Sequence, residues 1–274
     1  GFHFGFGIAA IGMAAGLIQY VLTRKNLPES VHEVTVPFTP RQNGILAGVL
    51  AGIALITFLL VMMGWMTTGN LATWVVSAVG IGAIALFIQL LTAKNVTNTE
   101  RSRVWAFIPL WIANAIFWAL YQQQFTVIPI YSDERLDWHI LGMDLPPTLV
   151  NSLAPIFVIL LGAGFAAMWT KLGDRQPRTT TQFSLALVTI GPAYWVFLTQ
   201  VGVSRVAVYW MVIIMFIFTV AELTISPTGM ALTTRLAPEA YKVNMMALYW
   251  TSLAMGNAFA GWCAQFYSQD TEVP

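Results

Sequence analysis

One carboxylate lies deep inside an apolar segment of this sequence. Glu222 falls within the apolar run 206–231, and its neighbours on both sides are apolar. A carboxylate at such a depth in a bilayer is costly unless it is paired, hydrated or protonated. Pro227 follows within the same run and removes a backbone donor, so we expect a kink that frees a carbonyl near Leu223. These features favour a substrate or proton site near the membrane midplane, and an ion pair that only joins helices is the alternative.

Amide and aromatic side chains recur at helical spacing in an earlier apolar run. Asn114, Trp118, Tyr121 and Gln122 would share one face of a helix, since they follow the order i, i+4, i+7 and i+8. Such a face is unfavourable against lipid. It suits either a wet cavity or hydrogen bonds between helices, and the spacing alone does not choose between them.

Two further polar positions are candidates with simpler interpretations. Asn151 opens an apolar run that also contains Pro155, which is typical of a capped helix start. Tyr249 lies on the polar side of the last apolar run, where packing between helices is the simpler reading.

No pattern typical of enzymes or metal sites is present. His3, His32 and His139 are scattered, and Cys263 is the only cysteine. The sequence shows no Ser-His-Asp set and no glycine-rich phosphate loop. We therefore expect neither an enzyme nor a bound cofactor or metal.

The composition places these residues in a membrane protein. Hydrophobic residues make up 57% of the 274 residues and charged residues only 9%, against about 25% charged in soluble domains. No basic patch with interleaved aromatic residues suggests nucleic acid as a partner. Runs long enough to span a bilayer as helices occur at residues 2–22, 43–66, 71–92, 104–130, 147–169, 182–203, 206–231 and 244–267. The fold class expected is an all-α membrane protein with eight transmembrane helices.

The loops between these runs differ in charge. Of the 13 Lys and Arg residues, Arg135 and Arg205 lie in one alternating set of loops and all the others in the second set. The positive-inside rule makes the second set cytoplasmic, and residues 133–144 then lie outside. Residues 26–42, which contain three prolines, are the best candidate for a cytoplasmic linker. Gly44, Gly48 and Gly52 share a face and favour a close hairpin over residues 43–92.

Several motifs resemble the proton-dependent oligopeptide transporter family of the major facilitator superfamily. The resemblance covers nearly the whole chain and includes the extra hairpin of bacterial members. It is carried by residues 9–13, 16–20 and 25–28 (helix six), 117–123 (helix seven), 222–223 with 226–229 (helix ten), and 245–249 with 256, 257 and 261 (helix eleven). It implies a half-bundle divided into the last helix of the N-terminal bundle (1–22), a linker (23–42), an inserted hairpin (43–92) and an incomplete C-terminal bundle of five helices (93–274).

The resemblance also implies roles for particular residues. Glu222 matches the helix-ten glutamate that receives the peptide amino terminus and interacts with a helix-four lysine, and it would take part in proton coupling. Trp118 matches the pocket aromatic of helix seven. Tyr121, Gln122, Asn151, Ser226 and Tyr249 complete the expected substrate-binding set.

The sequence departs from the family pattern at several of these positions. Gln122 stands where a glutamate is frequent, and Ala154 falls on the family's pocket asparagine. Asn151 sits where a glutamine is usual, and Tyr249 replaces a tryptophan. These changes bear on peptide preference more than on the fold.

The resulting hypothesis is proton-coupled symport of di- and tripeptides by alternating access in the cytoplasmic (inner) membrane. Protons would be the coupling ion, and the partners would be small peptides, the lipid bilayer and missing N-terminal helices of the same protein, because the chain looks like a partial sequence. A facilitator for another small solute, such as nitrate or an amino-acid conjugate, and a non-transporting membrane scaffold are the alternatives.

Overall fold

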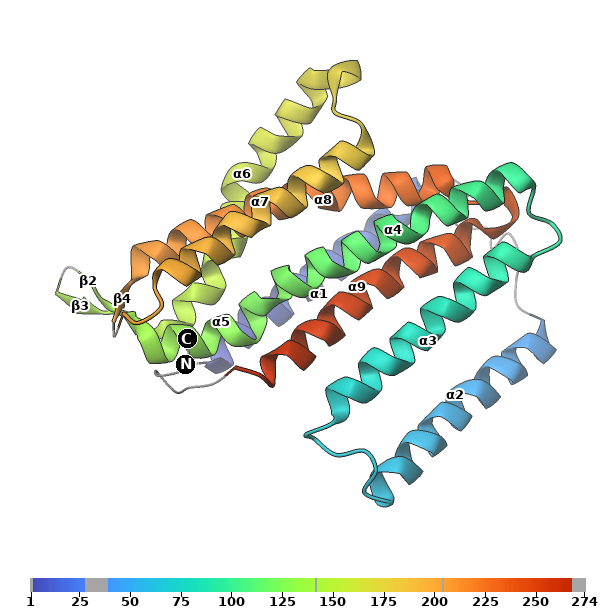
Figure 1. Ribbon diagram of the computed structural model, residues 1–274, viewed down its shortest axis with the longest axis horizontal. Coiled ribbons are helices and arrows are strands. Elements are labelled where there is room, and N and C mark those ends of the chain that lie inside the picture. The colour runs from blue at the N-terminus through green and yellow to red at the C-terminus, as the bar shows by residue number, and fades with distance from the viewer. Residues whose placement is uncertain (1, 28–38, 141, 204, 268–274) are drawn as a thin grey trace. The chain divides into compact units, whose positions relative to one another are not determined.

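The computed structural model describes residues 2–27, 39–140, 142–203 and 205–267, and long helices dominate it (Figure 1). The chain divides into two compact units, residues 1–65 and residues 66–274. The first unit contains α1 (Phe2–Thr23), a short turn η1 (Arg24–Asn26) and α2 (Pro40–Met62). Thr39 and Gln42 form a capping box at the start of α2, and Pro40 occupies its first turn. Most of the predicted linker lies outside the described residues.

The second unit holds the remaining long helices, joined by turns. Its helices are α3 (Leu71–Thr92), α4 (Asn98–Tyr121), α5 (Val127–Arg135), α6 (Val150–Leu172), α7 (Thr179–Thr199), α8 (Val208–Leu236) and α9 (Lys242–Ala264). Short 3-10 turns connect them: η3 (Gln122–Phe125), η4 (Pro147–Leu149), η5 (Gly173–Arg175) and η6 (Glu239–Tyr241). The predicted hairpin 43–92 takes one helix from each unit, and it stays a prediction.

The predicted membrane spans agree with the observed helices. Seven segments of the described chain are long and apolar enough to cross a membrane, and α4, η3 and α5 together make one of them. The eighth predicted span forms α9, which has 23 residues but is more polar than the others. Large apolar side chains point outward, with Ile159 78% and Val188 70% exposed. Lipid is the solvent that suits such surfaces.

Two apolar clusters form the core of the second unit. The larger cluster joins α4, α5, α6, α7 and α8 around Phe117, Phe218 and Met215. The smaller cluster joins α3, α4 and α9 around Leu90 and Leu248. Accordingly, α8 packs along α7 and contacts α6, while α9 lies between α4 and α3.

The fourth predicted span is interrupted, contrary to the single helix expected over residues 104–130. Helix α4 ends at Tyr121, η3 follows, and Thr126 has a non-helical backbone before α5 begins. Side-chain amides of the interrupted segment donate to backbone carbonyl groups nearby. Gln124 Nε2 donates to the Tyr121 carbonyl at 3.2 Å, and Gln123 Nε2 donates to the Ala260 carbonyl of α9 at 3.4 Å. Irregular backbone at membrane depth is tolerated where protein groups satisfy it in this way.

Short strands lie where α5 and α7 end. β1 (Leu136–Asp137) pairs in parallel with β4 (Val206–Ala207), and β2 (His139–Ile140) pairs antiparallel with β3 (Met143–Asp144). His139 Nδ1 lies 2.8 Å from Asp144 Oδ1 across this hairpin. The hydrogen bond and the charge of Asp144 raise the pKa of His139.

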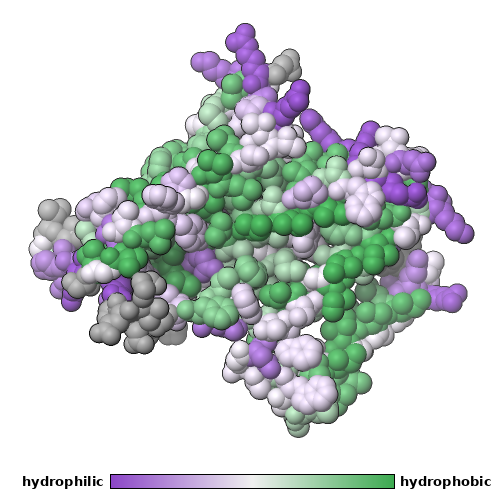
Figure 2. Space-filling view, in the orientation of Figure 1, coloured by the Kyte–Doolittle hydropathy of each residue, from purple (hydrophilic) through white to green (hydrophobic). Residues whose placement is uncertain are grey.

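Two of the Lys- and Arg-rich connections lie together in the second unit. In Figure 1 the α3–α4 and α8–α9 connections lie at one end of the second unit and the small strands at the other. Polar side chains gather at the helix ends in Figure 2, and apolar side chains cover the middle of the visible face. At the α3–α4 end, Glu100 Oε2 accepts from the Thr97 N–H and Oε1 accepts from the Glu239 N–H at 2.9 Å, so one carboxylate joins two connections.

Candidate functional site

The carboxyl group of Glu222 contacts the end of α4. Glu222 lies in the middle of α8 and is partly buried, and the Tyr121 hydroxyl donates a hydrogen bond to its Oε2. Tyr121 is the last residue of α4. Within the described residues no Lys, Arg or His forms an ion pair with Glu222. A carboxyl group at membrane depth thus has a neutral donor but no cation beside it.

Aromatic rings fix the position of the Tyr121 hydroxyl. The ring of Tyr121 stacks on Phe117 with centroids 6.0 Å apart and meets Trp118 edge-on at 5.4 Å. Phe218, one turn before Glu222 on α8, lies 6.0 Å away on the other helix. Phe117 and Phe218 are both fully buried. The hydroxyl therefore has little freedom, and the helices α4 and α8 hold the pair together.

Trp118 combines a fixed backbone with a free donor. Its Nε1 is buried and has no hydrogen-bond partner among the described residues. On α9, a Cβ added at Gly256 would lie 2.6 Å from the Trp118 Cβ and 2.7 Å from the Ala115 carbonyl oxygen. Only glycine permits this approach, so α9 packs directly against the backbone that carries Trp118.

The amide groups of the same region join α4 to α9. Gln122 Nε2 donates to Asn257 Oδ1 at 2.7 Å, and Asn114 Nδ2 donates to Ser252 Oγ at 2.7 Å. Hydrogen bonding between helices was one of the two interpretations of this face, and these contacts are of that kind. Gln122 Oε1 nevertheless stays buried without a partner in the described part of the chain.

The remaining predicted site residues are Ser226, Tyr249 and Asn151. Ser226 lies one turn after Glu222 on α8 and is partly buried. Tyr249 is 4% exposed in the smaller cluster, and its hydroxyl would be 2.8 Å from a Cβ added at Gly229 of α8. Asn151 is exposed in the first turn of α6, and no hydrogen bond among the described residues joins it to the Glu222 region. The structure thus joins Glu222 to Tyr121 and Tyr121 to Trp118.

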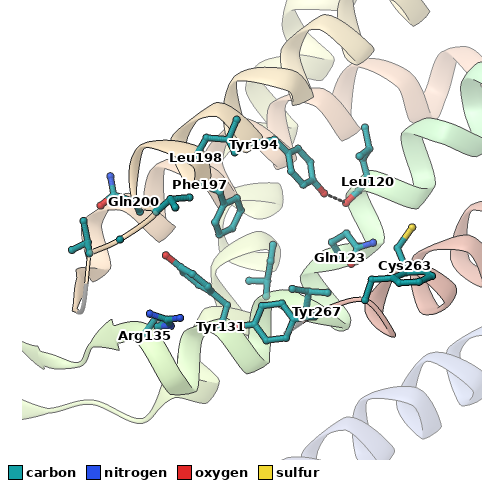
Figure 3. A pocket seen from close by; sticks show the side chains of 16 residues that line it. Leu120, Gln123, Tyr131, Arg135, Tyr194, Phe197, Leu198, Gln200, Cys263 and Tyr267 are labelled. Atoms are coloured by element: carbon teal, nitrogen blue, oxygen red, sulfur yellow. Dashed lines mark hydrogen bonds between the residues drawn. The ribbon is translucent and has the colours of Figure 1, made fainter. Parts of the chain in front are cut away.

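A cavity of about 500 Å³ opens beside the break between α4 and α5 (Figure 3). The rings of Tyr131, Tyr194 and Phe197 face it, and Arg135 lies at its rim. The Tyr194 hydroxyl donates to the Leu120 carbonyl at 2.6 Å, which satisfies another backbone group at the break. Glu222 is not among the residues that line this cavity, so the carboxyl group and the cavity are separate features.

The C-terminal part of the described chain closes one side of that cavity. The Tyr267 hydroxyl donates to Glu134 Oε2 at 3.2 Å. This bond joins the segment after α9 to α5.

Some residues of the site were not predicted from the sequence. Asn257, Phe218 and Tyr194 each contact a predicted site residue or the helix break. Gly256 next to Asn257 is a usable signal, because a small residue beside a polar one marks a close helix contact. Among the described residues, no group of three or more His, Cys, Asp or Glu side chains could hold a metal ion.

Comparisons with known proteins agree on one family. The POT family model matches residues 1–274. The transporter YclF of Bacillus subtilis (strain 168), described as uncharacterized, is 33% identical over 278 residues, which cover 99% of this chain and 56% of the relative. A di-/tripeptide transporter of Lactococcus lactis subsp. cremoris is 31% identical over 287 residues, which cover 99% of this chain and 58% of the relative.

Solved structures give the same result. The crystal structure of a peptide transporter POT in complex with sulfate is similar with a TM-score of 0.84 and 37% identity, over 98% of this chain and 56% of that chain. A POT family transporter in complex with 5-aminolevulinic acid gives a TM-score of 0.81 and 31% identity, over 96% and 56% of the two chains. The chain therefore spans a little over half the length of the proteins it matches.

Proposed function

Because this chain belongs to the POT family, we propose that it forms one wall of a proton-coupled symporter for di- and tripeptides. The chain is a multi-pass helical membrane protein of the major facilitator type, as its long apolar helices and its structural relatives show. Transport of peptides, coupling to protons and location in the inner membrane are parts of the proposal. The printed names of relatives support the first part, since one is a di-/tripeptide transporter.

A single observation carries the substrate assignment. The Glu222 carboxyl group lies in a membrane-spanning helix, has one neutral donor, and has no cation partner in the described chain. A carboxylate in such a place is unfavourable alone and becomes favourable beside a cation. The ammonium group at the amino terminus of a peptide supplies a cation of the right size and charge.

The geometry also indicates how the ammonium would be held. Tyr121 donates to one carboxylate oxygen, Oε2. The second oxygen has no hydrogen-bond partner among the described residues, so it can accept from a peptide ammonium without displacing Tyr121. The Trp118 ring beside Tyr121 would contact the peptide's apolar side chains. We propose Gln122, Ser226, Asn151 and Tyr249 as the outer residues of the same site.

Proton coupling would follow from competition at the same carboxyl group. A proton, a cation on another part of the protein and the peptide ammonium would each neutralise Glu222 in turn. Exchange between them would change which arrangement of the two halves is favoured, as alternating access requires. In this scheme residues 1–22 belong to the preceding bundle, residues 23–42 to a linker, residues 43–92 to an inserted hairpin and residues 93–274 to the C-terminal bundle.

The test compares two ligands on a transporter of the relatives' full length that contains these residues. Glu222→Gln keeps the shape of the side chain and removes its charge. We expect it to abolish proton-driven accumulation of dipeptides with a free amino terminus. Because losing a charge-assisted contact costs more than losing a neutral one, affinity should fall about tenfold or more for the free dipeptide and much less for its acetylated form.

The control for this experiment is Asp133→Asn, which removes one exposed carboxylate of α5. This variant should transport both ligands as the parent does. Equal losses for the free and the acetylated dipeptide in Glu222→Gln would show that Glu222 does not bind the amino terminus. Its role would then be structural, through the bond from Tyr121.

A further inference from the structure

A second cavity lies beside the C-terminal half of α8, the helix that carries Glu222. It has a volume of about 560 Å³ and is formed by the end of α6, the η5 turn, the start of α7 and the second half of α8. Its α8 wall runs from Pro227 to Arg235, and neither Tyr121 nor Glu222 is among the residues that line it. Nothing in the proposed peptide site uses it.

Two arginine side chains line this cavity. Arg178 enters from the start of α7 and Arg235 from the last turn of α8, and both are exposed at the rim. No Asp or Glu is among the described residues that line it. Two guanidinium groups at the rim of a concave surface create a positive potential there, which favours an anion.

The backbone of α7 adds to the same potential. Arg178 occupies the N-cap position of α7, and no side chain caps the helix there. The first N–H groups of a helix have no partners within it, and the helix dipole places a partial positive charge at this end. Thr179, the first residue of α7, lines the cavity. The first residue of this uncapped helix end and its N-cap residue Arg178 are thus both part of the cavity wall.

The wall of the cavity also contains a buried hydrogen-bond donor, the indole N–H of Trp169. Trp169 lines the cavity from α6, and its Nε1 is buried with no hydrogen-bond partner among the described residues. A buried donor left unpaired is unfavourable, so such atoms often mark a missing partner. An acceptor that enters from the cavity side would be such a partner.

Buried polar contacts keep the walls in place. The Thr228 hydroxyl of α8 donates to Gln182 Oε1, and Gln182 Nε2 donates to the Pro177 carbonyl at 2.9 Å. These bonds join α8 to the first turn of α7 and to the segment before it. Gln176 Nε2 also donates to the Trp169 carbonyl at 2.8 Å, which ties the turn back to α6. The cavity is thus a formed feature of three helices and not a gap in a loose turn.

We propose that this cavity binds a phosphate group, held between Arg178 and Arg235 and against the amino-terminal end of α7. Guanidinium groups match phosphate oxygens in geometry and charge, and helix amino termini bind phosphate readily. The phosphate belongs either to an anionic lipid headgroup or to free phosphate. The location favours the lipid, because the cavity lies where long apolar helices end and has Leu232 and Ala231 on its wall.

The experiment measures binding to the whole chain after removal of native lipid. Native mass spectrometry would compare phosphatidylglycerol with phosphatidylcholine of the same acyl chains. In a separate arm, calorimetry in a maltoside detergent would measure inorganic phosphate. We expect retention of phosphatidylglycerol over phosphatidylcholine, and a loss of affinity of about tenfold in the double variant Arg178→Gln/Arg235→Gln. Binding of inorganic phosphate with the same loss would identify free phosphate as a ligand too.

Two further variants make the result decisive. Lys94→Gln/Arg103→Gln removes the same charge from exposed positions of the α3–α4 region and should bind as the parent does. Arg178→Lys/Arg235→Lys keeps the charge but loses the forked donors, and it should give an intermediate affinity. The proposal is overturned if the parent binds neither ligand, or if both Gln double variants lose affinity equally.

Discussion

The pair formed by Tyr121 and Glu222 joins residues that are 101 positions apart in the chain. Its polar atoms lie among the rings of Phe117, Trp118 and Phe218. These rings hold the Tyr121 hydroxyl beside the carboxyl group. The proposed ammonium site requires such a fixed donor and acceptor.

The proposed contact between Trp118 and the peptide can be tested by a substitution that changes no charge. We expect Trp118→Ala in a full-length transporter to weaken peptide affinity, because an apolar contact surface is lost. Truncating an aromatic anchor of a binding site to alanine typically costs about 2 kcal/mol or more of binding free energy. Equilibrium binding of a series of dipeptides would measure the change.

Two controls accompany this variant. Trp118→Phe keeps a ring and should retain most of the affinity. Trp105→Ala removes a tryptophan of the same helix that is 60% exposed and should have no effect on binding. If Trp118→Ala binds every peptide as tightly as the parent does, Trp118 packs between helices and does not contact substrate.

Among the helices, α4 and α9 cross closely at Gly256. A Cβ at Gly256 would meet the Trp118 Cβ at 2.6 Å, the Ala115 carbonyl oxygen at 2.7 Å and the Ala119 nitrogen at 2.9 Å. Two of these atoms belong to the backbone and cannot move aside by changing a rotamer. The helices would have to separate.

Gly256→Ala should therefore destabilise the protein even though alanine favours helices. Overpacking of this kind costs about 1–3 kcal/mol, whereas the change from glycine to alanine in an open helix position gains up to about 1 kcal/mol. Gly261→Ala on the same helix is the matched control, because no atom outside the local helix lies within 4 Å of an added Cβ there. Thermal unfolding in detergent should show a lower midpoint for Gly256→Ala only. A midpoint unchanged in both variants would contradict the close crossing.

The helices themselves were largely predictable from the sequence. Long apolar runs define spans because lipid requires about 20 apolar residues in a helix, and the observed bounds follow the runs within a few residues. The break at Gln122–Phe125 was missed, because hydropathy does not report which backbone groups find partners. At the break, the Gln124 amide donates to the Tyr121 carbonyl, and the Gln123 amide donates to the Ala260 carbonyl of α9.

At the scale of the whole molecule, the distribution of charge predicts the orientation. The connections rich in Lys and Arg should be cytoplasmic, and residues 133–144 should be outside. Cys263 is the only cysteine, so Cys263→Ser gives a background for single-cysteine labelling. An impermeant reagent added outside should modify a cysteine at position 137 and not one at position 173. The opposite pattern would reverse the orientation.

The candidate site was predictable only in part. Glu222 was evident because a lone acid in an apolar run is rare, and its type and depth are properties of the sequence. Its partner was not, since nothing local to Tyr121 indicates contact with a residue on a helix 101 positions later. The phosphate cavity was also invisible, because Arg178 and Arg235 resemble ordinary positive-inside residues until the fold brings them together.

The interrupted helix gives the second unit a joint. On one side of it, Gly256 locks α4 to α9; on the other, the Trp138 indole N–H donates to the Ser132 carbonyl at 2.8 Å and links α5 to the segment before β2. Between these fixed parts, side-chain amides hold the chain, and amides can exchange partners through rotamer changes far faster than a helix can unfold. A rearrangement of these amides would change the angle between α4 and α5 without breaking the bond from Tyr121 to Glu222.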